Sequence, residues 1–126
     1  TLPPNKNYPV KDISQVKVND YDLLVLPGGV KALEKTRQEK RFIKFISDFY
    51  KADKVIACIC SGVQLLISAK IVKGKKIAGY YSMKDDLINA GAIYTDLPAV
   101  IDKNIITTAH YKDMGPWMRE VIKKVK

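Results

Sequence analysis

The stretch KVIACICSGVQLL, residues 54–66, decides the fold. Its apolar run ends at Cys60-Ser61-Gly62, and the helix-forming segment SGVQLLISAK follows at once. A short apolar run that stops at a turn is typical of a buried strand. The sequence therefore places Cys60 at a sharp corner between a strand and a helix, where a thiol either fills space or acts as a nucleophile.

Apolar strands and helices alternate on both sides of this corner. Upstream, YDLLVLPGG (21–29) predicts a strand that a Pro-Gly-Gly loop closes. Phe42, Ile46 and Phe49 recur at helical spacing and predict a helix of about 20 residues before the corner. Downstream, KIAGYY (76–81) predicts a further strand.

The remaining elements follow from similar patterns. SMKDDLINAG predicts a short helix with Ser82 as its N-cap and Gly91 as its C-cap. AIYTD (92–96) and AVIDKNIITTAH (99–110) predict strands, with a hairpin turn at DKN. Asp113 is expected to cap the last helix, whose predicted buried residues are Trp117, Met118, Val121, Ile122 and Val125.

This alternation predicts an α/β fold with a mostly parallel sheet that helices cover on both faces. With 126 residues, the chain is long enough for one domain, 1–126, with a real core. Residues 1–20 hold tandem prolines and little periodicity. We expect them to form an irregular lead-in, with a short edge strand around Val16–Val18.

Composition excludes several functional classes. Hydrophobic residues make up 47% of the chain, yet no apolar run is long enough to span a membrane. The opening TLPPNKNYPV does not resemble a secretory signal. The net charge of +9 comes from dispersed lysines with only three arginines, which predicts a solvated surface and no specific nucleic-acid partner.

The cysteines, Cys58 and Cys60, indicate a reducing, cytoplasmic setting. They lie two residues apart in a strand-like run, a poor geometry for a mutual disulfide. His110 is the only histidine, so a zinc site lacks ligands. No glycine-rich nucleotide motif occurs. We therefore expect neither a metal nor a cofactor.

Three candidate groups meet at the carboxyl edge of the predicted sheet, where chemistry gathers in such folds. They are the Pro27-Gly28-Gly29 loop, Cys60, and His110 after the last strand. The helix N-terminus would favour the Cys60 thiolate. The backbone amides of Gly29 and Ser61 would then form an oxyanion hole. Cys58 lies inside the strand and is expected to be inert.

The combination of strand-PGG, helix, strand-Cys-x-Gly and helix resembles the PfpI/ThiJ family of the class I glutamine amidotransferase-like superfamily. The resemblance runs from Tyr21 to Val125. The matching stretches are YDLLVLPGG, VIACICSGVQLLISAKIVKGKKIAGYYSMKDDLINAGAIY and VIDKNIITTAHYKDMGPWM. It implies a flavodoxin-like three-layer sandwich with Cys60 as the nucleophile at the elbow.

The resemblance also implies function. Members are described as intracellular cysteine peptidases, glyoxalase- or deglycase-like enzymes, chaperones and oxidative-stress proteins. Small carbonyl compounds or peptides are therefore the implied substrates, and homodimers or hexamers the implied assemblies. Tyr80 and Tyr81 match positions that border the family's active site.

The sequence departs from the family pattern in three places. Ser61 stands where the peptidase-like branch has a histidine, so a Cys–His pair at this position is excluded. His110 lies roughly where glutamine amidotransferases place a catalytic histidine, and it is either the missing base or a surface residue. The family's opening strand-helix-strand unit, with its glutamate partner for the cysteine, has no counterpart in 1–20. We expect about 40 to 50 residues to be missing or on another chain.

Three hypotheses follow. The first is an enzyme, a hydrolase or a glyoxalase- or deglycase-like protein, in which the Cys60 thiolate attacks a carbonyl group. The second is a redox-sensing or chaperone-like stress protein in which Cys60 oxidises without turnover of a substrate. The third is an inactive structural homologue.

Overall fold

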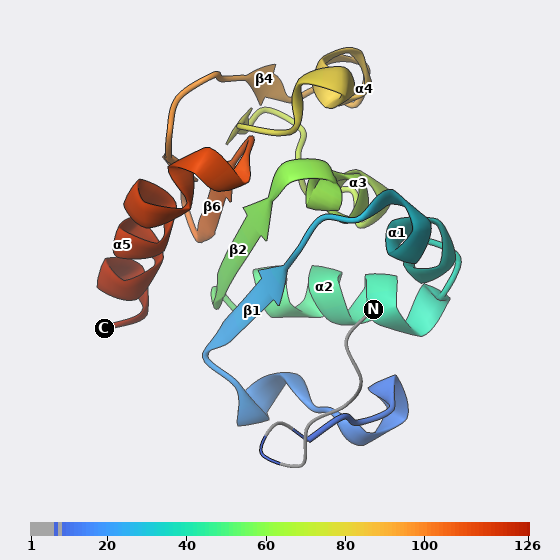
Figure 1. Cartoon of the computed structure of the whole chain (residues 1–126). Helices are drawn as coiled ribbons and strands as arrows, with labels where there is room; N and C mark the ends of the chain where they lie inside the picture. The colour runs from blue at the N-terminus through green and yellow to red at the C-terminus, as the bar shows by residue number, and fades with distance from the viewer. Residues whose placement is uncertain (1–6, 8) are drawn as a thin grey trace.

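Four strands build the central sheet of the computed structural model, which describes residue 7 and residues 9–126 (Figure 1). Their spatial order is β1-β2-β6-β5. β1, β2 and β6 are parallel, and only β5 is antiparallel to its neighbour. These strands are β1 (Leu23–Leu26), β2 (Val55–Ile59), β5 (Val100–Asp102) and β6 (Ile105–Thr108). The predicted α/β fold with a mostly parallel sheet is therefore confirmed.

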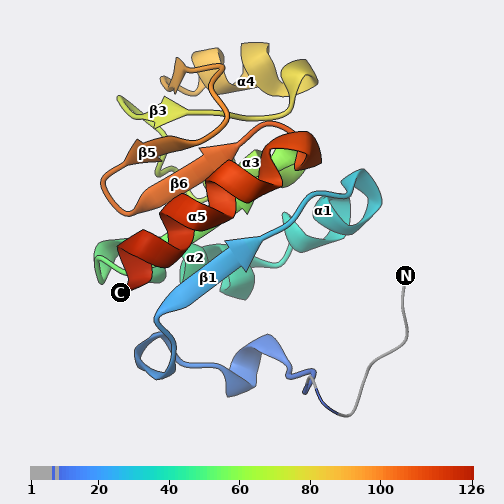
Figure 2. The same ribbon diagram turned by 60° about the vertical axis from the view of Figure 1, so that its left-hand side comes forward.

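Among the described residues, five α-helices and a small second sheet flank this sheet. The helices are α1 (Val30–Thr36), α2 (Lys40–Lys51), α3 (Val63–Ser68), α4 (Lys84–Asn89) and α5 (Met114–Val125). In Figure 2, α5 crosses one face of the sheet, while α1, α2 and α3 lie behind it. The second sheet pairs β3 (Lys76–Ile77) with β4 (Ile93–Tyr94) in parallel.

Strand alternation divides the core between the two faces of the sheet. Ile56 and Cys58 of β2 point toward the larger cluster, which holds Ile46 and Phe49 of α2. The alternate β2 residues join a smaller cluster under α5, with Trp117 and Val121. Because every residue of β2 is buried, this central strand is apolar throughout.

Several expected elements differ in detail. The single helix before the corner is two helices, because the chain turns after α1 and the Glu39 side chain then caps α2 by accepting a hydrogen bond from the Arg41 amide. The predicted edge strand at Val16–Val18 is wrong. Residues 9–22 hold two 3-10 turns instead, Ile13–Gln15 and Val18–Asp20.

The predicted cap and two buried positions are also wrong. Ser82 lies within the 3-10 turn Tyr81–Met83, so Met83 stands at the α4 N-cap without a side-chain bond. Gly91 does follow α4 with a φ of 91°, as a C-terminal glycine should. Ile122 and Val125 are 48% and 39% exposed, because α5 buries only the stripe around Trp117.

The segment KIAGYY (76–81) forms a strand only over Lys76–Ile77. Beyond it, the Ala78 amide donates to the Thr107 hydroxyl (2.8 Å) and the Tyr80 amide donates to the Cys60 carbonyl (3.1 Å). These contacts replace a strand ladder. They bring the segment over the carboxyl end of the main sheet, directly beside the corner.

Candidate active site

Cys60 occupies the expected corner between β2 and α3. A 3-10 turn, Cys60–Gly62, joins the two elements, and Cys60 has a φ of 61°. A positive φ is uncommon for a residue with a side chain and persists only where the surroundings enforce it. The residue is half-buried.

Two glycines let the chain close around this corner. A Cβ atom on Gly62 would lie 2.7 Å from the Leu26 carbonyl oxygen and 2.9 Å from that of Pro27. One on Gly28 would lie 3.2 Å from the Cys60 Cβ and 3.5 Å from its Sγ. The end of β1 and its Pro-Gly-Gly loop therefore pack directly against the cysteine.

The proposed oxyanion donors sit on either side of this contact. Ser61 is buried, and its hydroxyl lies 3.8 Å from the Cys60 sulfur. Gly29 follows Gly28 at the N-cap of α1 with a φ of 111°. Gly28, which sequence reasoning treated only as part of the loop, is the glycine that meets the sulfur. A contact between residues so far apart in sequence has no signal in either motif alone.

Cys58 lies in a different environment, inside β2 and two residues before Cys60. It is fully buried, and burial raises the pKa of its thiol. Both cysteines are free thiols. Cys58 is thus the more deeply buried of the two thiols, and the expected inertness of Cys58 stays a prediction.

His110 begins a 3-10 turn just after β6, at the same edge of the sheet. Its Nδ1 accepts a hydrogen bond from the Lys112 amide (3.1 Å). A neutral imidazole whose Nδ1 accepts carries its proton on Nε2. The nitrogen of His110 that remains available is therefore a donor, unless the ring gives up its bond to the backbone.

Aromatic rings connect His110 to the corner. The ring centroids of Tyr111, Tyr80 and Tyr81 lie 4.1, 6.4 and 6.5 Å from that of His110. Tyr80 also donates its amide to the Cys60 carbonyl, so it contacts both candidate residues. The structure thus brings Tyr80 and Tyr81, the tyrosines expected to border the site, close to His110. The Tyr80 amide joins this cluster to Cys60.

Thr108 is a polar residue that the sequence analysis did not single out. It ends β6 opposite Ile59, the residue before the cysteine. Its hydroxyl is buried and has no hydrogen-bond partner among the described residues. The preceding Thr107 is equally buried, but its hydroxyl accepts from Ala78. In the sequence, the only indication of a buried polar site here is the pair of threonines that ends an apolar run.

Other site types have no support in the described part of the chain. Residues 7 and 9–126 contain no cluster of three or more metal-ligating side chains. None of the described helices combines the length and apolar character that a membrane span requires.

Comparison with known proteins places the chain in a family. A sequence model of the DJ-1/PfpI family matches residues 5–124. The chain belongs to the DJ-1/PfpI family. The resemblance that the motifs around Cys60 indicated is therefore confirmed.

Individual relatives support the same assignment. A protein of Archaeoglobus fulgidus is 45% identical over 111 residues, covering 88% of this chain and 66% of its own length. The Deglycase PfpI of Pyrococcus furiosus is 38% identical over 112 residues, covering 89% of this chain and 67% of its own. This DJ-1/PfpI chain thus spans about two thirds of the length of these relatives.

A solved structure supports the fold. It is a two-domain protein of Anabaena variabilis with DJ-1/ThiJ/PfpI-like and ferritin-like domains. It superposes with a TM-score of 0.86 at 28% identity, covering 90% of this chain and 32% of that one.

Proposed function

We propose that this protein is a cysteine-dependent enzyme in which the Cys60 thiolate attacks a carbonyl carbon. One observation carries the proposal: Cys60 is held at a positive φ in a glycine-lined corner, where the residue is half-buried. Strain of this kind clusters at functional sites. The name of the Pyrococcus furiosus relative, a deglycase, supports chemistry on carbonyl-derived groups.

The residues around the sulfur have distinct proposed roles. Addition of the thiolate to an aldehyde or acyl carbon moves the carbonyl electron pair onto oxygen. The Gly29 and Ser61 amides would donate to that oxyanion. His110 would donate through Nε2 to a substrate oxygen instead of acting as the base, because its Nδ1 is engaged by Lys112. With an acyl substrate, the adduct would expel the amine, which takes up a proton, and leave a thioester that water hydrolyses. With an α-oxoaldehyde, a proton would move from the carbon that bears sulfur to the neighbouring carbonyl carbon, and water would then hydrolyse the resulting hydroxyacyl thioester to a hydroxy acid and the free thiol.

The proposed substrates are small α-oxoaldehydes, the adducts that they form on proteins, or peptides. Peptidase activity is the weaker option, because Ser61 cannot serve as a base at neutral pH. Both cysteines are free thiols, which supports a location in the cytoplasm, where thiols stay reduced.

Replacement of Cys60 tests the proposal. Consumption of methylglyoxal and cleavage of a casein substrate are measured for the wild type, Cys60→Ser and Cys58→Ala. Cys60→Ser should fall to the background rate, while Cys58→Ala, the matched control for loss of a thiol, should keep activity. Turnover by Cys60→Ser at the wild-type rate would exclude the mechanism.

A redox-sensing role is the second candidate, and the unequal burial of the cysteines favours it. Cys60 is half-buried, whereas Cys58 is fully buried. Peroxide treatment followed by peptide mass spectrometry should then show sulfinic acid on Cys60 only. Equal and slow oxidation of both cysteines would exclude this role.

A further inference from the structure

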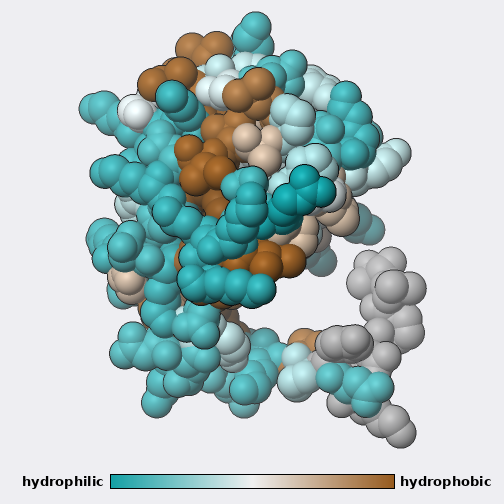
Figure 3. Space-filling model, turned by 90° about the vertical axis from the view of Figure 1, so that its left-hand side faces the viewer, coloured by the Kyte–Doolittle hydropathy of each residue, from teal (hydrophilic) through white to brown (hydrophobic). Residues whose placement is uncertain are grey.

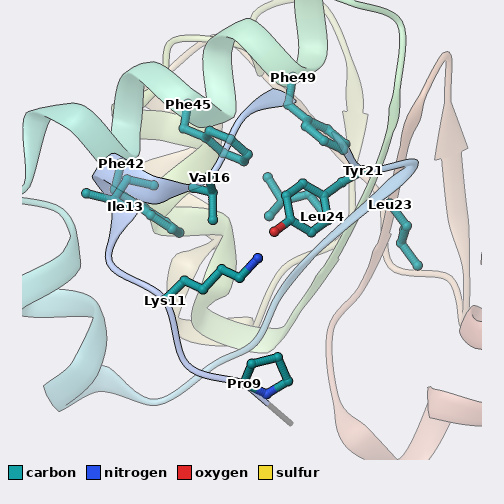
Figure 4. A pocket seen from close by; sticks show the side chains of 10 residues that line it. All are labelled: Pro9, Lys11, Ile13, Val16, Tyr21, Leu23, Leu24, Phe42, Phe45 and Phe49. Carbon is teal, nitrogen blue, oxygen red and sulfur yellow. The ribbon is translucent and has the colours of Figure 1, made fainter. Parts of the chain in front are cut away.

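Two hollows in the described part of the chain differ in chemical character. The larger, of about 610 Å³, lies between the lead-in and α2, and Figure 4 shows the rings of Phe42, Phe45 and Phe49 on one side of it. Lys11 is the only charged residue that lines this hollow. The other, of about 380 Å³, lies where the end of α2 meets the segment that follows α3. Its size is within the range of about 300–1,000 Å³ that is usual for small-molecule sites.

This second hollow, which we call the lysine hollow, is strongly positive. None of the residues that line it is acidic, and half of them are lysines: Lys51, Lys70, Lys73 and Lys75. None of these lysines forms an ion pair with a described residue. Asp48, on the same helix as Lys51, is already paired with Lys44 at 2.6 Å. The ammonium groups around the hollow thus have no carboxylate partner in the described part of the chain.

The ends of two helices account for only part of this charge. Lys51 lies in the last turn of α2, and Lys70 directly follows the C-cap of α3. The carbonyl groups at a helix C-terminus favour cations, but each end carries only about half a negative charge. The two helix ends therefore offset about one of the four positive charges, and an anionic ligand would offset the others.

Lys70 occupies a backbone position that favours glycine. Its φ is 59°, and its amide donates to the Ile67 carbonyl (3.0 Å). The Ile71 amide donates to the Leu66 carbonyl (3.3 Å), and these two bonds together form the Schellman motif that ends a helix. Glycine adopts a positive φ freely, whereas a residue with a side chain is strained there. Lysine at this position costs stability, which points to a function for its side chain.

Neighbouring residues hold two of the other lysines in place. The Lys75 ammonium lies over the ring of Tyr50, 5.1 Å from its centroid. The Lys73 side chain packs closely against Gly91, where an added Cβ atom would lie 3.1 Å from the Lys73 Cγ. These contacts restrict two long side chains before any ligand arrives, so less conformational entropy is lost on binding.

We propose that the lysine hollow binds a small polyanion that carries adjacent phosphate groups. Lysine ammonium groups bind phosphate oxygens as point charges with up to three hydrogen bonds each. Several phosphate groups in one molecule match the surplus of about three positive charges better than a single carboxylate does. The hollow lies beyond the C-terminal end of α3, whereas Cys60 precedes its N-terminal end, so this binding does not depend on chemistry at Cys60.

An extended nucleic acid fits the hollow less well than a compact ligand. Nucleic-acid backbones follow long positive grooves, whereas this site is a hollow of about 380 Å³. Arginine, whose planar group binds phosphates with two parallel hydrogen bonds, does not line it.

The test is a calorimetric titration of the protein with inorganic triphosphate at about 0.15 M salt, where weak attraction between exposed charges is screened. We expect one saturable site, and ¹⁵N NMR chemical-shift changes centred on the amides of residues 70–75. No saturable binding, or shifts spread over lysines elsewhere on the surface, would overturn the proposal. Tighter binding of an oligothymidylate to the same amides would also overturn it, since the ligand would then be a nucleic acid.

Lys70→Gly separates binding from folding. It removes one ammonium group from the hollow and relieves the positive φ. It should therefore weaken triphosphate binding roughly tenfold while raising the urea concentration at the midpoint of unfolding. Unchanged affinity for triphosphate in this variant would overturn the proposal.

Lys103→Gly is the matched control. Lys103 has a φ of 54° in the turn between β5 and β6, and it does not line the hollow. The substitution removes the same charge and the same kind of strain, so it should stabilise the fold in the same way. It should bind triphosphate nearly as the wild type does. Equal losses of affinity in the two variants would show that only the net charge matters, and would overturn the proposal.

Discussion

The cysteine corner shows how a few residues specify a reactive geometry. Cys60 has a positive φ because the chain must reverse from β2 into α3 within the short turn Cys60–Gly62. Gly62 makes that reversal possible by letting the Leu26 and Pro27 carbonyls approach its Cα closely. The same approach brings Gly28 against the sulfur.

Gly62→Ala should therefore destabilise the fold and impair the site. The added methyl group would lie within 3.0 Å of two backbone oxygens, which cannot move without shifting β1. Overpacking of this kind costs about 1–3 kcal/mol. Urea denaturation measures the free energy of unfolding, and iodoacetamide labelling reports the exposure of Cys60.

Gly115→Ala is the matched control for this substitution. Gly115 lies in α5, where an added Cβ would meet no atom within 4 Å. Because Gly115 lies in the first turn of α5, alanine there should change the free energy of unfolding by less than about 0.5 kcal/mol. Equal effects of the two substitutions would show that the close approach at Gly62 does not constrain the corner.

At the residue scale, the sequence predicted positions better than interactions. Cys60 was placed at the corner because strand, turn and helix signals are local. The contact of Gly28 with the sulfur joins residues 32 positions apart, and the accepting Nδ1 of His110 depends on a turn around Lys112. The first contact is non-local, and the second is local but depends on the conformation of a turn that the sequence pattern did not specify. The oxyanion roles of Gly29 and Ser61 stay predictions.

Among the elements, α5 shows how one helix secures the sheet. Trp117 is 2% exposed, and its indole N–H donates to the Ile106 carbonyl of β6 (3.1 Å). Val121, one turn later, packs on the same cluster. Trp117 therefore fixes α5 to the sheet both by packing and by a hydrogen bond.

Truncation of Trp117 should separate these two contributions. Trp117→Ala is expected to lower the free energy of unfolding by about 3–5 kcal/mol, the usual range for a buried aromatic residue. Trp117→Phe keeps most of the packing but loses the hydrogen bond, so it should lower the free energy of unfolding by about 1–2 kcal/mol. Met114→Ala, at a half-exposed position of the same helix, should change it by less than about 0.5 kcal/mol. A loss below 1 kcal/mol for Trp117→Ala would contradict this role.

The lead-in should loosen from α2 in acid. A side-chain hydrogen bond from Ser14 lowers the pKa of Asp12, and the Asp12 carboxylate also pairs with Arg41 of α2 at 3.9 Å. A side-chain hydrogen bond from Arg41 lowers the pKa of Glu39 at the start of α2. A carboxyl group whose pKa is lower in the folded state than in the unfolded state stabilises the folded state at pH values above the unfolded-state pKa. That stabilisation is lost as the pH falls through the folded-state pKa. The lead-in should thus stay docked at neutral pH and detach below about pH 4, the ordinary carboxyl range.

Methyl NMR signals of Ile13 measure this transition, because Ile13 belongs to the turn that Asp12 caps. Asp12→Asn should shift them at neutral pH toward their acid positions, whereas Asp20→Asn should leave them in place. Unchanged Ile13 signals down to pH 2 would contradict the prediction. Since both carboxyls are exposed, global stability should change little.

The elements themselves followed from the sequence where tertiary contacts did not intervene. β1, β2, the β5-β6 hairpin and the apolar face of α2 were predicted because their apolar runs and periodicities are strong. KIAGYY (76–81) was expected as a longer strand, but Ala78 bonds to a threonine side chain and Tyr80 to the Cys60 carbonyl. Such contacts override local β-propensity and cannot be seen in the segment alone.

For the whole molecule, the distribution of apolar surface matters more than the net charge. α5 presents Met114, Ile122 and Val125 to solvent at 46%, 48% and 39% exposure. Figure 3, which faces this side, shows apolar patches between hydrophilic side chains. Grouped apolar surface of this kind marks interaction sites.

We therefore predict that the protein forms a homo-oligomer, a dimer or hexamer, through α5. Sedimentation velocity should show a mass that rises with protein concentration. Because each copy carries a net charge of +9, added salt should screen the repulsion between copies and strengthen the association. Ile122→Glu should weaken it roughly tenfold by placing a charge in the apolar contact. Ile88→Glu, on α4 at a similar 49% exposure, is the control and should leave it unchanged. A monomer at every concentration, or equal effects of both substitutions, would rule out an interface on α5.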